Sequence, residues 1–184
     1  MAFECLKFDA RRRTVVRHWN SWLREADRWY CRYVRQVDES PFDFHEVAAV
    51  GFLSCAAARA NFVTLNEYQL VKISQTDRRK RVPGRADLWM MKGGVEYSLE
   101  FKRAWYDATQ SNLEDMLQTV RGDISAVPDD ECHHAAAGLI AHVSDQERVQ
   151  TYVDFCRNPK VHMAYRIGPK RQHGAFLYFS FKDR

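Results

Sequence analysis

The sequence predicts a single α/β domain with a mixed β-sheet. Two observations lead to this prediction. The hydrophobic residues change from helical spacing to strand-like runs and back along the chain. Strand-like segments also follow one another directly before they alternate with helical ones, which is typical of a mixed sheet. A length of 184 residues and a hydrophobic content of 46% are enough for one domain with its own core.

Two helices are predicted in the N-terminal part of the chain. Residues 11–37 carry aromatic side chains such as Trp19 at helical spacing, with arginines between them, so we expect a long amphipathic helix. Such an aromatic stripe more often packs into a core than forms a nucleic-acid stacking platform. The Ser40-Pro41 pair is typical of a helix start, and we expect the second helix over residues 40–59.

Three strands are predicted next in the chain, over residues 63–73, 85–91 and 95–104, because β-forming side chains dominate there. The Gly93-Gly94 pair predicts a tight turn between the last two strands. We therefore expect these two strands to form an antiparallel hairpin.

Helical and strand-like segments alternate in the remaining chain. Leu113, Met116, Leu117 and Val120 have helical spacing, so a helix is expected after residue 106. The elements expected after it are a loop at 122–131, a buried strand at 135–143, a helix at 144–156, a basic loop at 157–174 and a final strand at 175–181.

Charge is distributed unevenly along the chain, although the net charge is only +4. Residues 72–85 hold six Lys and Arg against one acid, whereas residues 86–156 hold five against thirteen. Basic segments beside one acidic segment suit phosphate-binding faces around an acidic, cation-binding centre. The same segments are equally consistent with ordinary solvated surfaces.

The location expected from the sequence is the cytoplasm. The apolar stretches are too short to span a bilayer, and charge follows the first residues where a secretory signal would be apolar. The five cysteines are widely spaced and odd in number, which favours reduced thiols, and they show no zinc-binding pattern.

The segment from residue 84 to residue 103 carries the candidate chemistry. Alternation along a strand places Glu100 and Lys102 on one face, about 6.6 Å apart, with apolar residues on the other face. Asp87, on the neighbouring strand across the turn, is expected to lie alongside Glu100. Two carboxylates from adjacent strands suit a hard cation such as Mg²⁺, with Mn²⁺ as a substitute. Lys102 could orient a water or stabilise charge on a phosphate, or act as a base if its pKa is depressed.

These residues resemble the PD-(D/E)XK, or restriction-endonuclease-like, nuclease superfamily. The match is Asp87, twelve intervening residues and then Glu100-Phe101-Lys102, although Ala86 stands where the nominal motif has proline. The predicted order of helix, three strands, helix and strand over residues 40–143 is similar to the core of that family. Residues 1–39 would then be an N-terminal helical extension, and residues 144–184 a C-terminal helix and strand.

The resemblance implies a role for each matching residue. Asp87 and Glu100 would be metal ligands, and Lys102 the catalytic lysine. Some branches of the family add a glutamate from the preceding helix, a place that Glu46 occupies, while Glu67 on the first strand is the competing candidate. The implied activity is hydrolysis of nucleic-acid phosphodiester bonds, with DNA as the expected substrate. The implied process is repair, recombination, restriction or defence against mobile elements.

Basic residues near this motif are candidates for phosphate contacts, either as an arm at the active site or as a solvated loop. They are Arg78, Arg79, Lys80, Arg81, Arg85 and Arg103. Enzymes of this kind often act as dimers, and the aromatic N-terminal helix is a possible interface.

Two alternatives remain open from the sequence. The first is a catalytically silent nucleic-acid-binding or protein-interaction module on the same fold. The second is an unrelated α/β interaction protein in which Trp19, Trp22 and Trp29 form a partner surface. The second alternative predicts that Asp87 and Glu100 lie apart in the fold.

Overall fold

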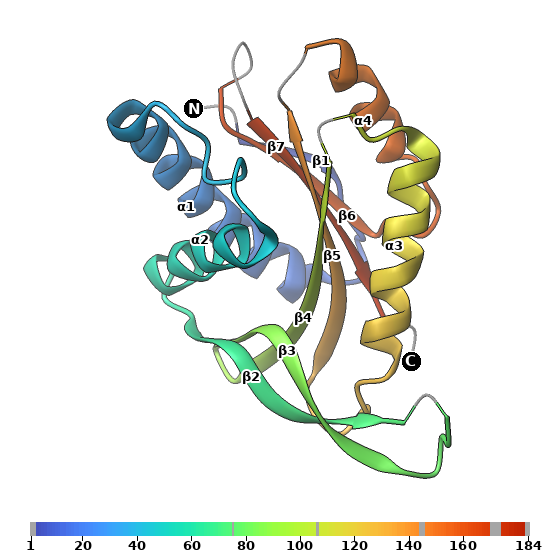
Figure 1. Ribbon diagram of the computed structural model, residues 1–184. Coiled ribbons are helices and arrows are strands. Elements are labelled where there is room, and N and C mark those ends of the chain that lie inside the picture. The colour runs from blue at the N-terminus through green and yellow to red at the C-terminus, as the bar shows by residue number, and fades with distance from the viewer. Residues whose placement is uncertain (1–2, 75, 106, 144–145, 170–173, 183–184) are drawn as a thin grey trace.

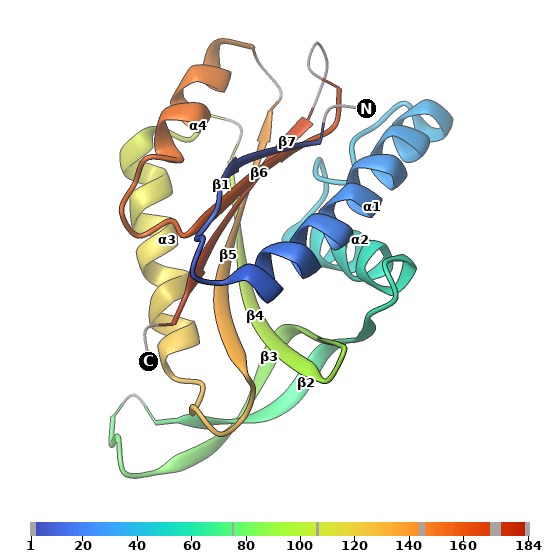
Figure 2. The same ribbon diagram turned by 180° about the vertical axis from the view of Figure 1, so that it is seen from behind.

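The computed structural model describes residues 3–74, 76–105, 107–143, 146–169 and 174–182 (Figure 1). Within these residues the chain is an α/β protein with a seven-stranded mixed sheet, as the sequence predicts for the class. Helices cover both faces of the sheet, and Figure 2 shows β1 lying along β6 between the two helical layers, as the edge strand of the sheet.

The sheet has the strand order β1-β6-β7-β5-β4-β3-β2. Strands β4 and β5 are parallel and joined by a helix, whereas the other neighbouring pairs are antiparallel. The strands are β1 (Glu4–Lys7), β2 (Val63–Ile73), β3 (Arg81–Lys92), β4 (Val95–Ala104), β5 (His134–Val143), β6 (Met163–Ile167) and β7 (Gly174–Phe181).

Helices α1 (Arg13–Val37) and α2 (Glu46–Arg59) pack on one face of the sheet. The aromatic stripe of α1 enters this core: Trp19 and Trp22 are fully buried, and the Trp22 Nε1–H donates to the Leu53 carbonyl of α2 at 2.8 Å. The prediction of a core stripe is confirmed. Trp19 and Trp22 are therefore not available as a partner or dimer surface.

Helices α3 (Gln110–Ser125) and α4 (Val149–Phe155) cover the opposite face, over a second core that includes alternate residues of β5. Helix α3 continues to Ser125, so the expected loop at 122–131 begins later than predicted. A 3₁₀ turn (Gln146–Arg148) precedes α4. The first two residues of the expected capping box, Ser144 and Asp145, lie outside the described residues.

The predicted start of the second helix is wrong. Ser40 opens a turn in which its N–H donates to Asp43 Oδ2 at 2.9 Å, while its hydroxyl accepts the N–H of buried Phe42. The helix begins only at Glu46, because the His45 side chain accepts the N–H of Ala48 and caps it. Serine, proline and aspartate favour turns as well as helix starts, so the sequence pattern could not distinguish the two.

Two short strands were not predicted. Strand β6 lies inside the expected loop at 157–174, and β1 precedes the first expected helix. All five residues of β6 are buried, so the strand lacks the alternation of buried and exposed residues that identifies a half-exposed strand in a sequence. Strand β1 has four residues and pairs at the sheet edge.

The β2–β3 hairpin leaves the sheet halfway along its length. Strands β2 and β3 pair from end to end, whereas β3 pairs with β4 only from Leu88 to Lys92. The bend coincides with Glu67, which has a left-handed backbone (φ 51°) and interrupts the β2–β3 register. We call residues 69–74 and 76–85 the hairpin arm. It crosses below the C-terminal end of α3, where Ile73 N–H donates to Ala126 O (Figure 1).

None of the described helices is long and apolar enough to cross a membrane. All five cysteines are free thiols.

Candidate functional site

The departure of β3 uncovers an edge of β4, and two carboxylates bind that edge. Asp87 Oδ2 accepts the Phe101 N–H at 2.7 Å, and Glu46 Oε2 accepts the Arg103 N–H at 2.9 Å. Each carboxylate supplies an acceptor to a main-chain donor at the uncovered edge. Asp87 and Glu46 are thereby positioned on either side of Lys102.

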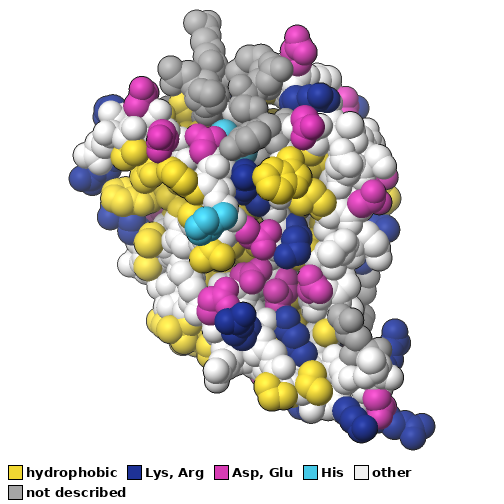
Figure 3. Space-filling model, viewed as in Figure 1, with side chains coloured by type: hydrophobic (Ala, Val, Ile, Leu, Met, Phe, Trp, Pro, Cys, Tyr) yellow, Lys and Arg dark blue, Asp and Glu magenta, His cyan; other side chains and the backbone are white. Residues whose placement is uncertain are grey.

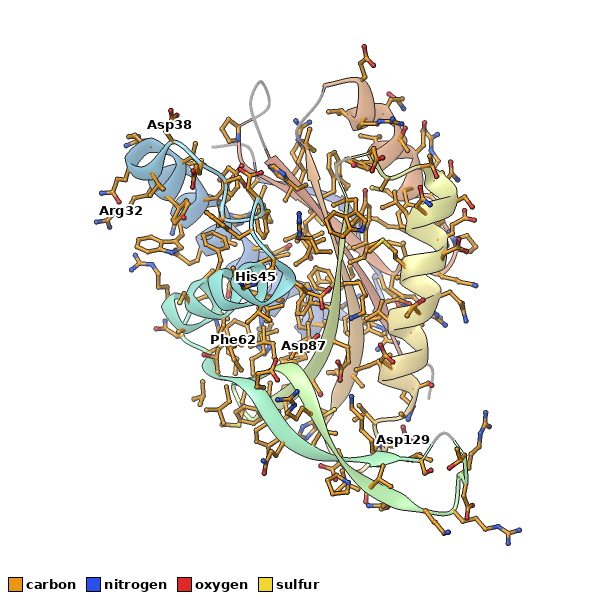
Figure 4. The ribbon with its side chains drawn as sticks, in the orientation of Figure 1. Arg32, Asp38, His45, Phe62, Asp87 and Asp129 are labelled. Atoms are coloured by element: carbon orange, nitrogen blue, oxygen red, sulfur yellow. The ribbon has the colours of Figure 1, made fainter. Side chains whose placement is uncertain are left out.

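Figure 4 shows Asp87 where the hairpin leaves the sheet, close to the N-terminal end of α2 that His45 marks. Figure 3 shows the surface of the molecule from the same side. Acidic side chains gather at the centre of this face, with basic side chains above and below them. The predicted acidic centre with basic surroundings is therefore present on this face.

Glu100 is the most buried acid of the group, with 7% of the residue exposed. Burial raises the pKa of its carboxyl to about 7, against an opposing hydrogen bond from Lys72, while Asp87 and Asp123 raise it further. The Lys72 ammonium donates to Glu100 Oε1 at 2.6 Å. Glu100 thus changes charge near neutral pH, which is unusual for a carboxyl and common at functional sites.

Lys102 donates to Glu46 Oε1 at 3.2 Å. Burial acts to lower the pKa of Lys102, but the charge and hydrogen bond of Glu46, with Asp87 and Asp123, outweigh it and the pKa is raised. Lys102 is therefore a fixed ammonium. Of the two roles open from the sequence, this favours orientation and charge stabilisation over action as a base.

Asp87 also has a raised pKa, because it is partly buried and lies near Glu46 and Glu67. Asp87, Glu46 and Glu67 line one small pocket of about 30 Å³, enough for an occupant the size of water. Both candidate glutamates therefore lie near Asp87. Glu67 is bound by Arg85 at 3.0 Å, whereas Glu46 contacts Lys102 and the β4 edge, so Glu46 is the better placed third carboxylate.

The described residues include no group of three His, Cys, Asp or Glu side chains already close enough to hold a metal ion. Lys72 and Lys102 supply positive charge to the carboxylates. Asp87 Oδ1 and Glu100 Oε2 accept no hydrogen bond from the described part of the chain, so one oxygen of each remains open to a ligand. Such oxygens are the donors that a hard divalent cation prefers.

The predicted basic residues fall into two groups. Arg85 and Arg103 adjoin the carboxylates, where Arg103 donates to the Phe42 carbonyl at 3.1 Å. Arg78, Arg79 and Lys80 are exposed at the turn of the hairpin arm, and Arg81 pairs with Asp130 at 3.0 Å. The turn is six residues beyond Lys72, or up to about 20 Å along an extended strand. Arg78, Arg79 and Lys80 are therefore not part of the carboxylate cluster itself.

Two residues of this region were not predicted from the sequence. Lys72 reaches Glu100 from the hairpin arm, and its stem lies over Gly84, where a Cβ atom would be 2.7 Å from Lys72 Cδ. Asp123, expected in a loop, acts on Glu100 and Lys102 from α3. The sequence shows a run of positive charge at 72–85, but it contains no signal of which basic side chain turns towards the carboxylates.

Comparisons of the chain with protein-family models, with curated proteins and with solved structures gave no match.

Proposed function

We propose that this protein is a metal-dependent nuclease that hydrolyses nucleic-acid phosphodiester bonds, with DNA as the first substrate to test. One observation supports the proposal above the others. At the uncovered edge of β4, the carboxylates of Asp87 and Glu46 flank Lys102. The buried acid Glu100 lies two residues before Lys102 on the same strand, close enough to Asp87 for the two charges to interact.

The order of elements supports a restriction-endonuclease-like core. Between residues 46 and 143 the chain runs α2, β2, β3, β4, α3, β5, which is the order of helix, three strands, helix and strand expected from the resemblance. Asp87 lies on the second of these strands, and Glu100 and Lys102 on the third. We propose that the elements before and after this core are additions to it.

Asp87 and Glu100 would hold a Mg²⁺ or Mn²⁺ ion through the two oxygens that the chain leaves open, with Glu46 as a third ligand. The bound ion would neutralise charge on the scissile phosphate and lower the pKa of a water. These are hard carboxylate oxygens on adjacent elements, so the donor set fits such an ion.

The other groups of the site act on charge and position. The Lys102 ammonium, held by Glu46, would stabilise negative charge that develops on the phosphate oxygens. Lys72 holds the Glu100 carboxylate in one orientation. Because burial raises the pKa of Glu100 to about 7, a proton would compete with a cation for this carboxyl near neutral pH. Arg85 and Arg103 would bind the flanking phosphates.

The test is cleavage of labelled DNA and RNA, duplex and single-stranded, with Mg²⁺, with Mn²⁺ and with chelator. We expect cleavage that needs the metal and is lost in Asp87→Asn and Glu100→Gln. Glu96→Gln is the matched control, because Glu96 is an acid on the same strand that pairs with His133 away from the site. Cleavage that survives chelator, or that both site variants retain, would refute the proposal.

One observation favours a second candidate, a catalytically silent nucleic-acid-binding module. Lys72 and Lys102 already neutralise Glu100 and Glu46, as in a structural ion-pair cluster. A silent module would bind DNA with a steep salt dependence and would cleave nothing in either metal.

A further inference from the structure

Trp105 is exposed in a way that sets it apart from the other tryptophans. Of its surface 68% is exposed, whereas Trp19 and Trp22 are fully buried and Trp29 and Trp89 are partly buried. Exposing a large aromatic side chain forgoes the hydrophobic free energy that its burial would give. This side chain is therefore available to a ligand.

The position of Trp105 links it to the candidate site. It follows β4 directly, three residues after Lys102, or about 10 Å along an extended chain. That distance corresponds to about three base steps of a stacked strand, at 3.4 Å each. A nucleic-acid strand whose phosphate lay at Lys102 would pass Trp105 within a few nucleotides.

Charge beside the ring indicates the kind of ligand. The Arg103 guanidinium lies 5.6 Å from the centre of the Trp105 ring, within cation–π range, and this contact helps to fix the ring. Aromatic rings next to arginines bind nucleic-acid strands by stacking on bases while the cation attracts phosphate. On the α2 side of the site, exposed Phe44 (42%) and Val47 (64%) flank Glu46 in the sequence.

We propose that Trp105 stacks on an unpaired nucleobase, so that the substrate is single-stranded at or next to the position where it is cut. The inference rests on the proposed nuclease function for the identity of the ligand. Bases inside a duplex already stack on one another and offer no free face to a side chain, whereas an unpaired base does. Trp105 is then a determinant of substrate class, and the carboxylate cluster carries the chemistry.

Binding without cleavage tests this proposal separately from the function. The affinity of the full chain is measured in chelator by fluorescence anisotropy for a labelled single-stranded DNA, for its duplex and for a single strand of the same length without bases. Trp105→Ala should weaken binding to the single strand about ten-fold, as expected for the loss of one stacked base. Duplex and base-free strand should bind both proteins equally, and Trp105→Phe should keep most of the affinity.

Phe8→Ala is the matched control, because Phe8 is an aromatic residue with 59% exposure that lies before α1 and outside the site. It should leave all three affinities unchanged. The fluorescence of the wild type should also be quenched by the single strand more than that of Trp105→Phe.

Equal losses on all three ligands, no loss in Trp105→Ala, or the same loss in Phe8→Ala would each overturn the proposal. So would a protein that binds no single strand. A positive binding result without cleavage in Mg²⁺ or Mn²⁺ would retain the stacking site and reject the nuclease. Cleavage in Mg²⁺ or Mn²⁺, together with unchanged single-strand binding in Trp105→Ala, would retain the nuclease and reject the stacking site.

Discussion

Replacement of Glu100 by Gln separates the contribution of this residue to stability from its contribution to function. Glutamine has the shape of the protonated carboxyl and can still accept from Lys72. The pKa of Glu100 is about 7 in the fold, against an ordinary value of 4.5. At 1.36 kcal/mol per pKa unit, the ionised form therefore costs the folded protein roughly 3 kcal/mol at pH 8. We expect Glu100→Gln to be more stable than the wild type there by up to that amount.

The direction of the pH dependence follows from the raised pKa. The folded protein binds this proton more tightly than the unfolded chain does, so the stabilisation is fully present below about pH 4.5. It is lost as the pH rises towards about 7. The free energy of unfolding, measured with urea at several pH values, should therefore fall across this window in the wild type relative to Glu100→Gln. Mg²⁺ at pH 8 should raise the melting temperature of the wild type and leave that of the variant unchanged.

Glu96→Gln again serves as the control. Its free energy of unfolding should differ from that of the wild type by the same amount at every pH in this window. Parallel curves for the wild type and Glu100→Gln between pH 5 and pH 7 would refute the assignment of a raised pKa to Glu100. Equal stabilisation of both proteins by Mg²⁺ would place the cation elsewhere.

Three further predictions follow from the structure. Lys102→Met should lower the cleavage rate in Mg²⁺ by about 10²-fold, as for other lost charge-stabilising groups, with little change in urea unfolding, and a wild-type rate would contradict its role. Gly84→Val should displace the stem of Lys72 and so remove its hydrogen bond to Glu100. Carbon-13 NMR should then show the pKa of Glu100 rising above about 7, and an unchanged pKa would show that Lys72 still reaches this carboxyl. Trp22→Phe should cost about 1–3 kcal/mol in urea unfolding, because the Leu53 carbonyl loses its buried donor, and a cost below about 0.5 kcal/mol would not fit that hydrogen bond.

The central part of the fold was predictable because local patterns and tertiary structure agree there. The strands at 63–73 and 95–104 have the bounds that the sequence predicts, and the Gly93-Gly94 turn between β3 and β4 has the positive φ angles that glycine adopts readily. Strand β6 was missed because it is buried throughout and lies in a basic segment. Its burial depends on strands distant in sequence, which a local pattern does not contain.

The candidate site was predictable as a set of residues and not as a set of contacts. Alternation along β4 places Glu100 and Lys102 together, and the hairpin brings Asp87 to them. The partners of these groups depend on where β3 leaves β4, which follows from the bend at Glu67. Lys72 reaches Glu100 because β2 bends at Glu67. The sequence of β2 contains no signal that the strand changes direction there.

Local opening of the hairpin arm is coupled to the protonation of Glu100. The contacts that hold the arm include the Ile73–Ala126 hydrogen bond, the Arg81–Asp130 ion pair and the Lys72–Glu100 pair. Its amide hydrogens should exchange with deuterium through local opening, at lower free energy than those of β4 and β5. Each opening withdraws Lys72 from Glu100, and protonation of Glu100 weakens the same pair. Without Lys72 the pKa of Glu100 is higher than about 7, so a protonated Glu100 favours the open arm. After correction for intrinsic rates, exchange in the arm should therefore accelerate as the pH falls from alkaline values towards about 7, while the centre of the sheet stays protected.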